Sequence, residues 1–402
     1  MTLSGAKALL HAFVTPFLLT ASPVADSPLG CPAVRSETLS ASGAPRVILT
    51  EGPLLEPSMV AGPFDQPRSV AFLPGGRYLV TERPGKLLFV SPGGANHEIG
   101  GVPAVLTAGH GGLIDVALDP DFAANDTLYL SYLDGTEEAS VFKVLRAKLD
   151  LAGDQLTEAA VIFESTPGKR PDQIGGRLAV TPDGYLFLSL GDRWAGDPAQ
   201  DLADDLGSII RIRTDGSIPG DNPFQHRAGA RPEIWSYGHR NPQGLAFNPK
   251  TGHLWSDEHG AQGGDELNLI LPGRNYGWPV ISHGVEYSGR PIGVGSAKEG
   301  LEQPVHYWVP LSIAPSGLAV SSDAAHETVW ISTLAGQMLV RLTFGENCAV
   351  REEHYLKNRL GRLRDVRVGP DGALYVLTDG QEGMLYRLDW ATEDTVQAKA
   401  RP

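Results

Sequence analysis

The sequence predicts an all-β fold, a six-bladed β-propeller, and the main observation behind this prediction is an internal repeat. Two stretches of alternating apolar residues, joined by a turn that contains Pro, Asp, Asn or Gly, recur six times, beginning at Ser69, Asp115, Arg177, Gly244, Gly317 and Asp365. Alternation with a period of two is typical of strands that bury one face. Glycine and proline number 48 and 31 among 402 residues, which favours many turns over long helices.

The spacing of the repeats indicates how many residues each successive blade contains. Successive copies begin 46, 62, 67, 73 and 48 residues apart, and four strands with their turns need about 40–50 residues. The longer spacings in the middle of the chain therefore indicate loop insertions. After the sixth copy only about three strands fit before Trp390, so the stretch PRVILTE at 45–51 is a candidate for the strand that closes the ring and removes a free edge. A pair of β-sandwiches is the alternative fold.

The beginning of the chain resembles a secretory signal. Lys7 precedes an apolar run over residues 8–21, and small residues follow. We expect a signal peptide over residues 1–25, a flexible segment over 26–44, the propeller over 45–392 and a tail over 393–402. The expected location is therefore periplasmic or extracellular.

The net charge and the number of cysteines make some partners and some metal sites unexpected for this chain. The formal net charge is −14 without a Lys/Arg run, so a polyanion is repelled and nucleic acid is not expected as a partner. No apolar run after the first 25 residues is long enough to span a bilayer. Cys31 and Cys348 are too few for a disulfide framework or a four-cysteine metal site. Whether these two residues pair, or Cys31 carries a lipid, stays open.

Residues 233–287 hold the densest group of residues suited to chemistry. Arg240 and Asn241 lie in a loop between a Gly-His pair and Pro242, and an arginine there offers a rigid fork for oxygen ligands. The segment EHGAQGGDE at 258–266 mixes carboxylates with glycines. Such a backbone can turn its carbonyls inward, and carbonyl and carboxylate oxygens are the ligands that Ca²⁺ prefers. A surface arginine that bonds backbone carbonyls is the alternative interpretation of Arg240, and the spacing of the acidic segment does not match an EF-hand loop.

Several of these motifs resemble one family closely. The stretches GGRL, GHRNPQGLAFNP, EHG followed by GGDELNLI, NYGWP and RLRDVRVGPDGALYVLTD resemble the soluble quinoprotein aldose dehydrogenases, also called glucose/sorbosone dehydrogenases, over residues 60–390. The resemblance implies a six-bladed propeller with pyrroloquinoline quinone (PQQ) and Ca²⁺ as cofactors. It also implies oxidation of an aldose sugar at C1 to the lactone, with electrons passed to an external acceptor. We expect a monomer or a homodimer.

The resemblance also implies roles for individual residues. Gly260 and Ala261 match positions whose carbonyls hold the catalytic Ca²⁺, and Glu266 and the carbonyl of Tyr276 match ligands of a second, structural Ca²⁺. Asp172 matches an acid that contacts the sugar.

The remaining matches concern the quinone. Arg240 and Asn241 match residues that contact the quinone and the sugar oxygen. Arg362 and Arg364, at alternate positions of one strand, match a pair that binds PQQ carboxylates. Ser312 matches a residue whose hydroxyl hydrogen-bonds a PQQ carboxylate.

Two departures from the family pattern bear on catalysis. The family usually has a histidine, the general base, where this chain has Gln173, and glutamine cannot accept the proton. The family also carries a lysine that pairs with PQQ where this chain has Ala335. A third difference offers compensation, because His110 stands where the family usually has a glutamine beside the same sugar hydroxyls. We hypothesise that His110 is the base and that Gln173 holds the sugar; the alternative is an impaired enzyme.

Two further function classes stay open. A propeller that kept its fold and lost turnover would bind sugar, quinone or a protein partner. A calcium-dependent lactonase would need several inward-facing carboxylates, whereas arginines dominate the predicted site.

Overall fold

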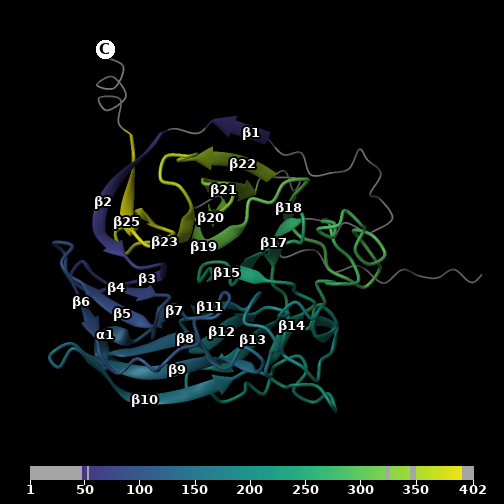
Figure 1. Ribbon diagram of the computed structural model, residues 1–402, viewed down its shortest axis with the longest axis horizontal. Coiled ribbons are helices and arrows are strands. Elements are labelled where there is room, and N and C mark those ends of the chain that lie inside the picture. The colour runs from purple at the N-terminus through teal and green to yellow at the C-terminus, as the bar shows by residue number, and fades with distance from the viewer. Residues whose placement is uncertain (1–47, 52–53, 323–325, 345–349, 392–402) are drawn as a thin grey trace, which may run out of the picture. The chain divides into compact units, whose positions relative to one another are not determined.

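Six sheets arranged as a six-bladed β-propeller make up the computed structural model (Figure 1). The structure describes residues 48–51, 54–322, 326–344 and 350–391. The predicted signal peptide, the N-terminal segment, both cysteines and the tail lie outside the described residues. No helix in the described part of the chain has the length and apolar character needed to cross a membrane.

The first three blades follow one another along the chain, each running from its innermost to its outermost strand. Blade 1 contains β3 (Pro67–Leu73), β4 (Arg77–Glu82), β5 (Lys86–Val90) and β6 (Asn96–Ile99). Blade 2 contains β7 (Leu113–Leu118), β8 (Thr127–Gly135), β9 (Ser140–Asp150) and β10 (Gln155–Glu164). Blade 3 contains β11 (Gly175–Val180), β12 (Tyr185–Leu190), β13 (Ser208–Arg213) and β14 (Ile234–Tyr237). Two short helices lie in connections, α1 (Phe122–Asn125) and η2 (Asp197–Gln200).

The other three blades complete the ring. Blade 4 contains β15 (Pro242–Phe247), β16 (Leu254–Glu258), β17 (Asp265–Leu269) and β18 (His306–Trp308). Blade 5 contains β19 (Pro315–Ser322), β20 (Glu327–Thr333), β21 (Leu339–Phe344) and β22 (Val350–Tyr355). Blade 6 contains β23 (Leu363–Val368), β24 (Leu374–Thr378), β25 (Gly383–Trp390) and β2 (Leu55–Phe64). Each predicted repeat forms the first two strands of one blade, as the sequence analysis expected.

The strand that closes the ring is β2, and not the candidate at 45–51. β2 pairs antiparallel with β25 from Leu55 opposite Trp390 to Phe64 opposite Gly383. The candidate segment instead forms β1 (Ile48–Glu51), which pairs parallel with β22 at the outside of blade 5. Pro57 and Pro63 hide the strand pattern of β2 in the sequence, and an outermost strand tolerates proline because one of its edges needs no pairing.

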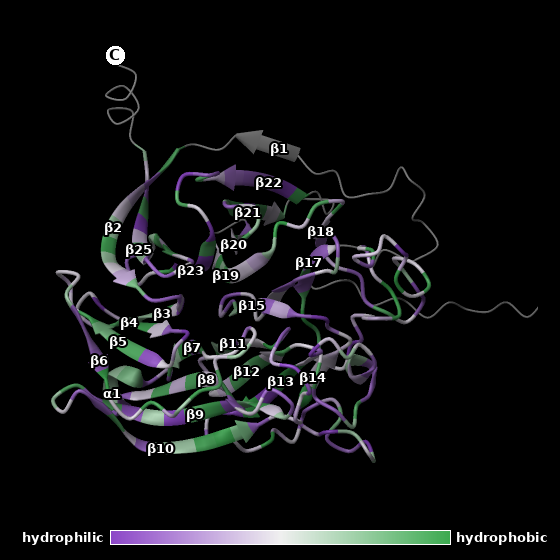
Figure 2. Cartoon of the chain, in the orientation of Figure 1, coloured by the Kyte–Doolittle hydropathy of each residue, from purple (hydrophilic) through white to green (hydrophobic). Residues whose placement is uncertain are grey.

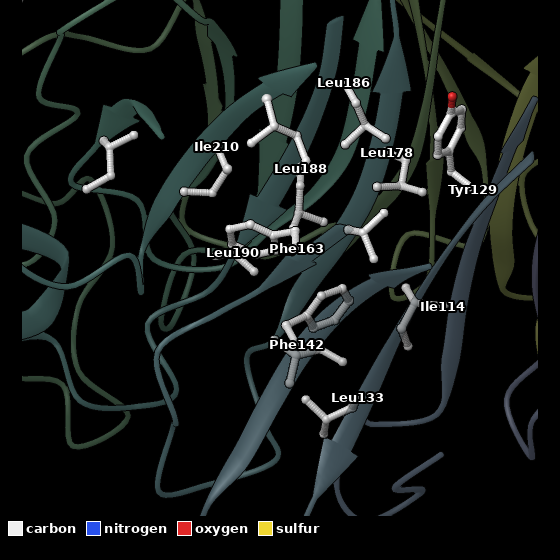
Figure 3. Packing of buried hydrophobic residues seen from close by; sticks show 14 of the residues in the cluster. Ile114, Tyr129, Leu133, Phe142, Phe163, Leu178, Leu186, Leu188, Leu190 and Ile210 are labelled. Carbon is white, nitrogen blue, oxygen red and sulfur yellow. The ribbon is translucent and has the colours of Figure 1, made fainter. Parts of the chain in front are cut away.

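The hydrophobic core lies in layers between neighbouring blades. Hydrophobic and hydrophilic residues alternate along strands such as β9 (Figure 2). By contrast, β20 is buried at every position, so this part of the blade buries residues on both faces. Side chains from blades 2 and 3 pack together in one such layer, which includes Ile114, Tyr129, Phe142, Leu178 and Leu188 (Figure 3). Equivalent layers join blades 1 and 2, 3 and 4, 5 and 6, and 6 and 1.

A bulge interrupts the pairing near the start of every inner strand. In β3, Pro67 and Ser69 pair with consecutive residues of β4, so the residue between them is left unpaired. In β23, Leu363 and Asp365 pair with consecutive residues of β24 in the same way. The other four inner strands, β7, β11, β15 and β19, shift register at the same place. Bulges bend a strand and redirect its side chains, so this repeated feature shapes one face of the propeller. We call the face at which the inner strands begin the front face.

Buried ion pairs cross the centre of the ring. Arg367 of β23 donates to Asp115 of β7 and to Asp365, each at 2.9 Å. Arg177 of β11 contacts the same two carboxylates at 3.5 and 3.3 Å. These charges connect blades 2, 3 and 6. Because each carboxylate meets two guanidinium groups, the network compensates charges that would be costly if left unpaired in the interior.

Candidate active site on the front face

Most of the predicted site residues lie in the connections that lead into inner strands, which brings them together on the front face, whereas the predicted calcium ligands lie between β16 and β18. His110 precedes β7, Gln173 precedes β11, and Arg240 precedes β15. The connection before β19 carries Ser312, and Arg362 directly precedes β23. Residues more than 250 positions apart therefore meet around the ring, since the inner strands contact one another in a closed circle.

His110 and Gln173 contact each other, as the proposed exchange between neighbouring loops requires. The backbone N–H of Gln173 donates to Nδ1 of His110 at 3.2 Å. A neutral His110 ring therefore carries its proton on Nε2, which lies 3.8 Å from Oδ1 of Asp172. Burial lowers the pKa of His110 below its ordinary value of 6.5; Asp172 opposes this shift, and Arg68 adds to it. The ring is thus mostly neutral at neutral pH and is oriented by a carboxylate.

The side chain of Gln173 is buried and faces protein groups. In the amide orientation that satisfies both ends, Nε2 donates to Asp192 at 2.5 Å and Oε1 accepts from Nη2 of Arg240 at 2.8 Å. Gln173 has a left-handed backbone, with φ of 48°. Its carbonyl lies so close to Gly191 that a Cβ there would be 1.9 Å away, so residue 191 has to be glycine. These contacts indicate that Gln173 orients Arg240; its predicted contact with the sugar stays a prediction.

Arg240 lies at the centre of the site and is held from several sides. Its guanidinium carbon lies 5.3 Å from the ring centroid of Trp194 and 5.2 Å from that of Trp278. Nη1 donates to the carbonyls of His259, at 3.1 Å, and Gly260. Nε is buried and makes no hydrogen bond with the described residues. The side chain is therefore fixed while it keeps one donor available.

Asn241 is buried beside Arg240 and contacts the ring of His259. Its Nδ2 lies 3.4 Å from Nδ1 of His259, and its Oδ1 accepts from Gln243 at 2.9 Å. Nε2 of His259 lies 2.8 Å from the carbonyl of Pro315. Burial lowers the pKa of His259 to about 4, so this ring is neutral and structural at neutral pH.

Three of the four predicted calcium ligands line one small cavity. Gly260, Glu266 and Tyr276 border a space of about 20 Å³ together with Arg240 and Glu258. Ala261, the fourth, is next in sequence to Gly260 and pairs with Gly263 in an isolated bridge. Among the described residues no three His, Cys, Asp or Glu side chains are grouped as a metal site. A Ca²⁺ ion here would therefore need carbonyl oxygens in addition to the carboxylates.

The carboxylates beside this cavity differ in their partners. Glu258 accepts from His239 at 3.1 Å, from the backbone N–H of Arg240 at 2.7 Å and from Asn268 at 2.9 Å. Glu266 accepts from Asn268 at 3.2 Å. Burial, and then the charge of Glu258, raise the pKa of Glu266 well above its ordinary value. The cavity thus borders one carboxylate that favours its charged form, Glu258, and one carboxyl group that favours its protonated form, Glu266.

Carboxylates hold the predicted PQQ-binding side chains. Arg362 donates to Asp379 at 2.8 Å, and Arg364 donates to the same carboxylate at 3.1 and 2.8 Å. Burial opposes ionisation of Asp379, but Arg364 and Arg362 prevail and lower its pKa to about 2. Ser312 donates to Asp265 at 2.6 Å, where two backbone N–H groups also donate. Ala335 is exposed in the turn after β20 and contributes no charge.

A larger cavity elsewhere has none of the predicted site residues. It measures about 260 Å³ and is lined by residues 200–203, 227–230 and Tyr237.

Comparison with known proteins agrees with this geometry. The profile of the glucose/sorbosone dehydrogenase family matches residues 64–387, which span all six blades. The chain belongs to the glucose/sorbosone dehydrogenase family.

Two relatives match most of the length of this member of the glucose/sorbosone dehydrogenase family. An uncharacterized protein of Synechocystis sp. is 40% identical over 91% of this chain and 94% of its own length. Aldose sugar dehydrogenase YliI of Escherichia coli is 40% identical over 81% of this chain and 90% of its own length. The structure of the PQQ-bound form of an aldose sugar dehydrogenase from Streptomyces coelicolor is 30% identical, with a TM-score of 0.71 over 86% of this chain and 99% of that one.

Several residues of the site were missed in the sequence. Asp192 binds Gln173 and the indole of Trp278, and Asp379 holds both arginines. Asp379 directly follows the second strand of a repeat, Asp192 follows such a strand one residue later, and Glu258 ends the second strand of another. An acid at this position of several repeats is a signal that could have found them. Trp194 carries no such signal, because it lies in an irregular loop.

Proposed function

We propose that this protein oxidises aldose sugars at C1 to the lactone, with PQQ and Ca²⁺ as cofactors and an external acceptor for the electrons. The observation that carries the proposal is the meeting of three groups on the front face: the His110–Asp172 pair, Arg240, and the arginines around Asp379. Each group suits one requirement of the reaction, namely a base, a fixed donor near the sugar and quinone, and cations for carboxylates.

The arginines suit the carboxylates of PQQ. Arg364 is buried and Arg362 is half exposed, with side-chain exposures of 11% and 50%. Arginine recognises carboxylates in a planar, bidentate geometry, and Asp379 fixes both guanidinium groups beforehand. Ser312 lies in the connection before β19 on the same face and would add a hydroxyl.

The cavity beside Gly260, Glu266 and Tyr276 suits Ca²⁺ by its ligand chemistry. Its lining offers backbone carbonyls and carboxylate oxygens, which are the ligands of a hard cation. Titration of the protein with Ca²⁺ by calorimetry tests this part. We expect Glu266→Gln to weaken binding at least tenfold, whereas the exposed Glu158→Gln should leave binding unchanged.

Bound PQQ would supply the hydride acceptor, and Ca²⁺ would supply Lewis-acid polarisation. The chain's own residues must take the proton of the sugar hydroxyl. His110 is suited to this, because Nδ1 carries no proton and Asp172 faces Nε2–H, where it would stabilise the imidazolium. The contact from the Gln173 N–H, at 3.2 Å, is long and would yield when the hydroxyl approaches. Arg240 would hold the sugar oxygen.

Single substitutions separate the candidates for the base. We expect His110→Gln to lower turnover by about 10²–10⁴-fold and to abolish its pH dependence. An unchanged rate would end the exchange hypothesis.

If His110 is not the base, Gln173→His should raise turnover, because it restores the usual family residue. Asp172→Asn should lower turnover less than His110→Gln, since it removes only the orienting charge.

An activity assay tests the proposal as a whole. Apoprotein is mixed with PQQ and Ca²⁺, and dye reduction is measured with a panel of aldoses. Reduction with at least one aldose supports the proposal. PQQ binding without reduction favours the second candidate, a binding propeller, which the glutamine at position 173 and the engaged Nδ1 of His110 favour. Absence of PQQ binding would overturn both.

We also propose export from the cytoplasm, on the basis of Lys7 and the apolar run at 8–21. Fractionation of the source cells and N-terminal sequencing of the mature protein test this. Cleavage near residue 25 is expected, and an intact cytoplasmic chain would contradict it.

A further inference from the structure

Arg68 occupies the same structural position as Arg364 in the neighbouring blade. Pro67 and Ser69 of β3 both pair with residues of β4, but Arg68 between them has no pairing partner. Arg364 of β23 is left unpaired in the same way. The inner strands β3 and β23 are neighbours where the ring closes. Because both arginines are the extra residue of an equivalent bulge, both lie on the front face.

The two arginines differ in how their charge is balanced. Arg364 donates twice to Asp379. Arg68 donates from Nη2 to the carbonyl of His110 at 3.1 Å, and within the described ranges it makes no ion pair. A backbone carbonyl accepts a hydrogen bond but does not neutralise a cation, so Arg68 keeps an uncompensated charge.

Other positive charges lie close to Arg68. Burial, then the charges of Arg364 and Arg83, lower the pKa of the Arg68 guanidinium well below its ordinary value, and Asp379 opposes them. Arg83 donates to the carbonyls of Thr107, Gly109 and Gly111 and to Gln66, and no carboxylate of the described residues binds it.

Arg362 and Arg364 bond Asp379, and the charges of Arg364, Asp379 and Arg83 all act on Arg68, so these residues form one group of four guanidinium groups with a single carboxylate. It stands out in a chain whose formal net charge is −14. Like charges close together repel each other, so an anion bound between these guanidinium groups would stabilise the arrangement.

We propose that Arg68 is a third arginine ligand for a carboxylate of the cofactor and supplies the positive charge that Ala335 lacks. This inference rests on the proposed function. The chemistry that Arg68 recognises is a carboxylate beside the Arg364 guanidinium. A carboxylated sugar could present the same group, so the test includes both sources.

The test is a titration of the apoprotein with PQQ, in Ca²⁺, followed by quenching of tryptophan fluorescence. Arg68→Ala should weaken PQQ binding by about tenfold or more, the usual effect of losing a charge-assisted bond, and should reduce the dependence of binding on salt. Arg68→Lys should retain part of the affinity. The matched control is Arg77→Ala, which removes an exposed arginine that bonds only the Pro74 carbonyl in the turn between β3 and β4.

A rescue variant distinguishes two causes of weaker PQQ binding in Arg68→Ala. One is the loss of a charge that binds the ligand, and the other is a structural effect on the His110 loop, to which Arg68 is bonded. Adding Ala335→Lys to Arg68→Ala should restore affinity if only charge was lost. Equal PQQ affinity in wild type and Arg68→Ala, or no rescue by Ala335→Lys, overturns the inference and leaves the proposed function intact. Wild-type protein that binds no PQQ fails the proposed function itself. If a uronate, and not PQQ, shows the loss on Arg68→Ala, the carboxylate belongs to the sugar and the inference is wrong.

Discussion

At the scale of single residues, the site depends on groups that fix one another before any ligand binds. Gln173 accepts a hydrogen bond from Arg240 and is itself held by Asp192, and Trp194 and Trp278 enclose the guanidinium with aromatic faces. Preorganised donors need no rearrangement when charge develops on the substrate.

The pH dependence of kcat/KM should report the lowered pKa of His110. Only the unprotonated ring can accept the sugar's proton, so kcat/KM should rise with pH through a pKa below the ordinary 6.5 and level off near neutrality. His110→Gln should remove this inflection. A wild-type profile that rises only above pH 7 would contradict the assignment.

Trp194→Ala should lower kcat/KM by about three- to thirtyfold, the range expected for losing one cation–π contact to Arg240. Trp194→Phe should retain part of the rate because it keeps an aromatic face. Trp390→Ala is the control, since Trp390 is about equally exposed, at 48% against 44%, and lies at the end of β25, the third strand of blade 6. Equal losses in both alanine variants would show a general effect on folding.

At the scale of elements, the bulged start of each inner strand places the site. Hydroxyl groups on the second strand support these bulges: Thr81 binds the N–H of Ser69, Ser131 that of Asp115, and Ser332 that of Gly317. In blade 3, Ser189 accepts from the N–H groups of both Gly176 and Arg177, at 3.1 and 3.0 Å. The bulge redirects the strand just after Gln173.

Ser189→Ala should therefore destabilise the fold by about 2–4 kcal/mol, since it leaves two buried N–H groups without a partner. Urea unfolding followed by circular dichroism measures this. Ser58→Ala in the outer strand β2 is exposed and should change the free energy of unfolding by less than about 0.5 kcal/mol. If Ser189→Ala behaves like Ser58→Ala, the hydroxyl does not support the bulge.

Much of this arrangement was predictable from the sequence. Period-2 repeats predicted the six blades, and family motifs selected residues that the ring brings to one face. The bulges were not predictable, because alternation locates a strand but not its hydrogen-bond register. β2 was missed because its prolines are typical of loops. The contact of Gln173 with Arg240 depends on loop conformation, which no local pattern encodes.

At the scale of the whole molecule, polar contacts between blades supplement the apolar layers. Glu352 of blade 5 accepts from His306 at 3.0 Å and Trp308 at 3.1 Å in blade 4, and from His354 at 2.6 Å. Burial alone would raise the pKa of Glu352, but these donors prevail and lower it below its ordinary value of 4.5. The ionised carboxylate therefore stabilises the contact between blades 4 and 5.

This lowered pKa predicts how stability depends on pH. A carboxyl whose pKa is lower in the folded state stabilises the fold above its unfolded pKa, and this contribution is lost as the pH falls below 4.5. Glu352→Gln should reduce stability at pH 7 and flatten its decline in acid, as measured by urea unfolding between pH 3 and 7. Glu158→Gln, which removes an exposed partner of Lys148, should change neither. An unchanged acid profile in Glu352→Gln would refute this role.

The most direct measurement of the central claim is a crystal structure of the protein with PQQ and Ca²⁺. We predict the quinone on the front face, with its carboxylates against Arg362 and Arg364 and its reactive carbonyls toward Arg240. Density for PQQ elsewhere on the propeller, or both arginines still directed only at Asp379 beside an unliganded front face, would contradict the account.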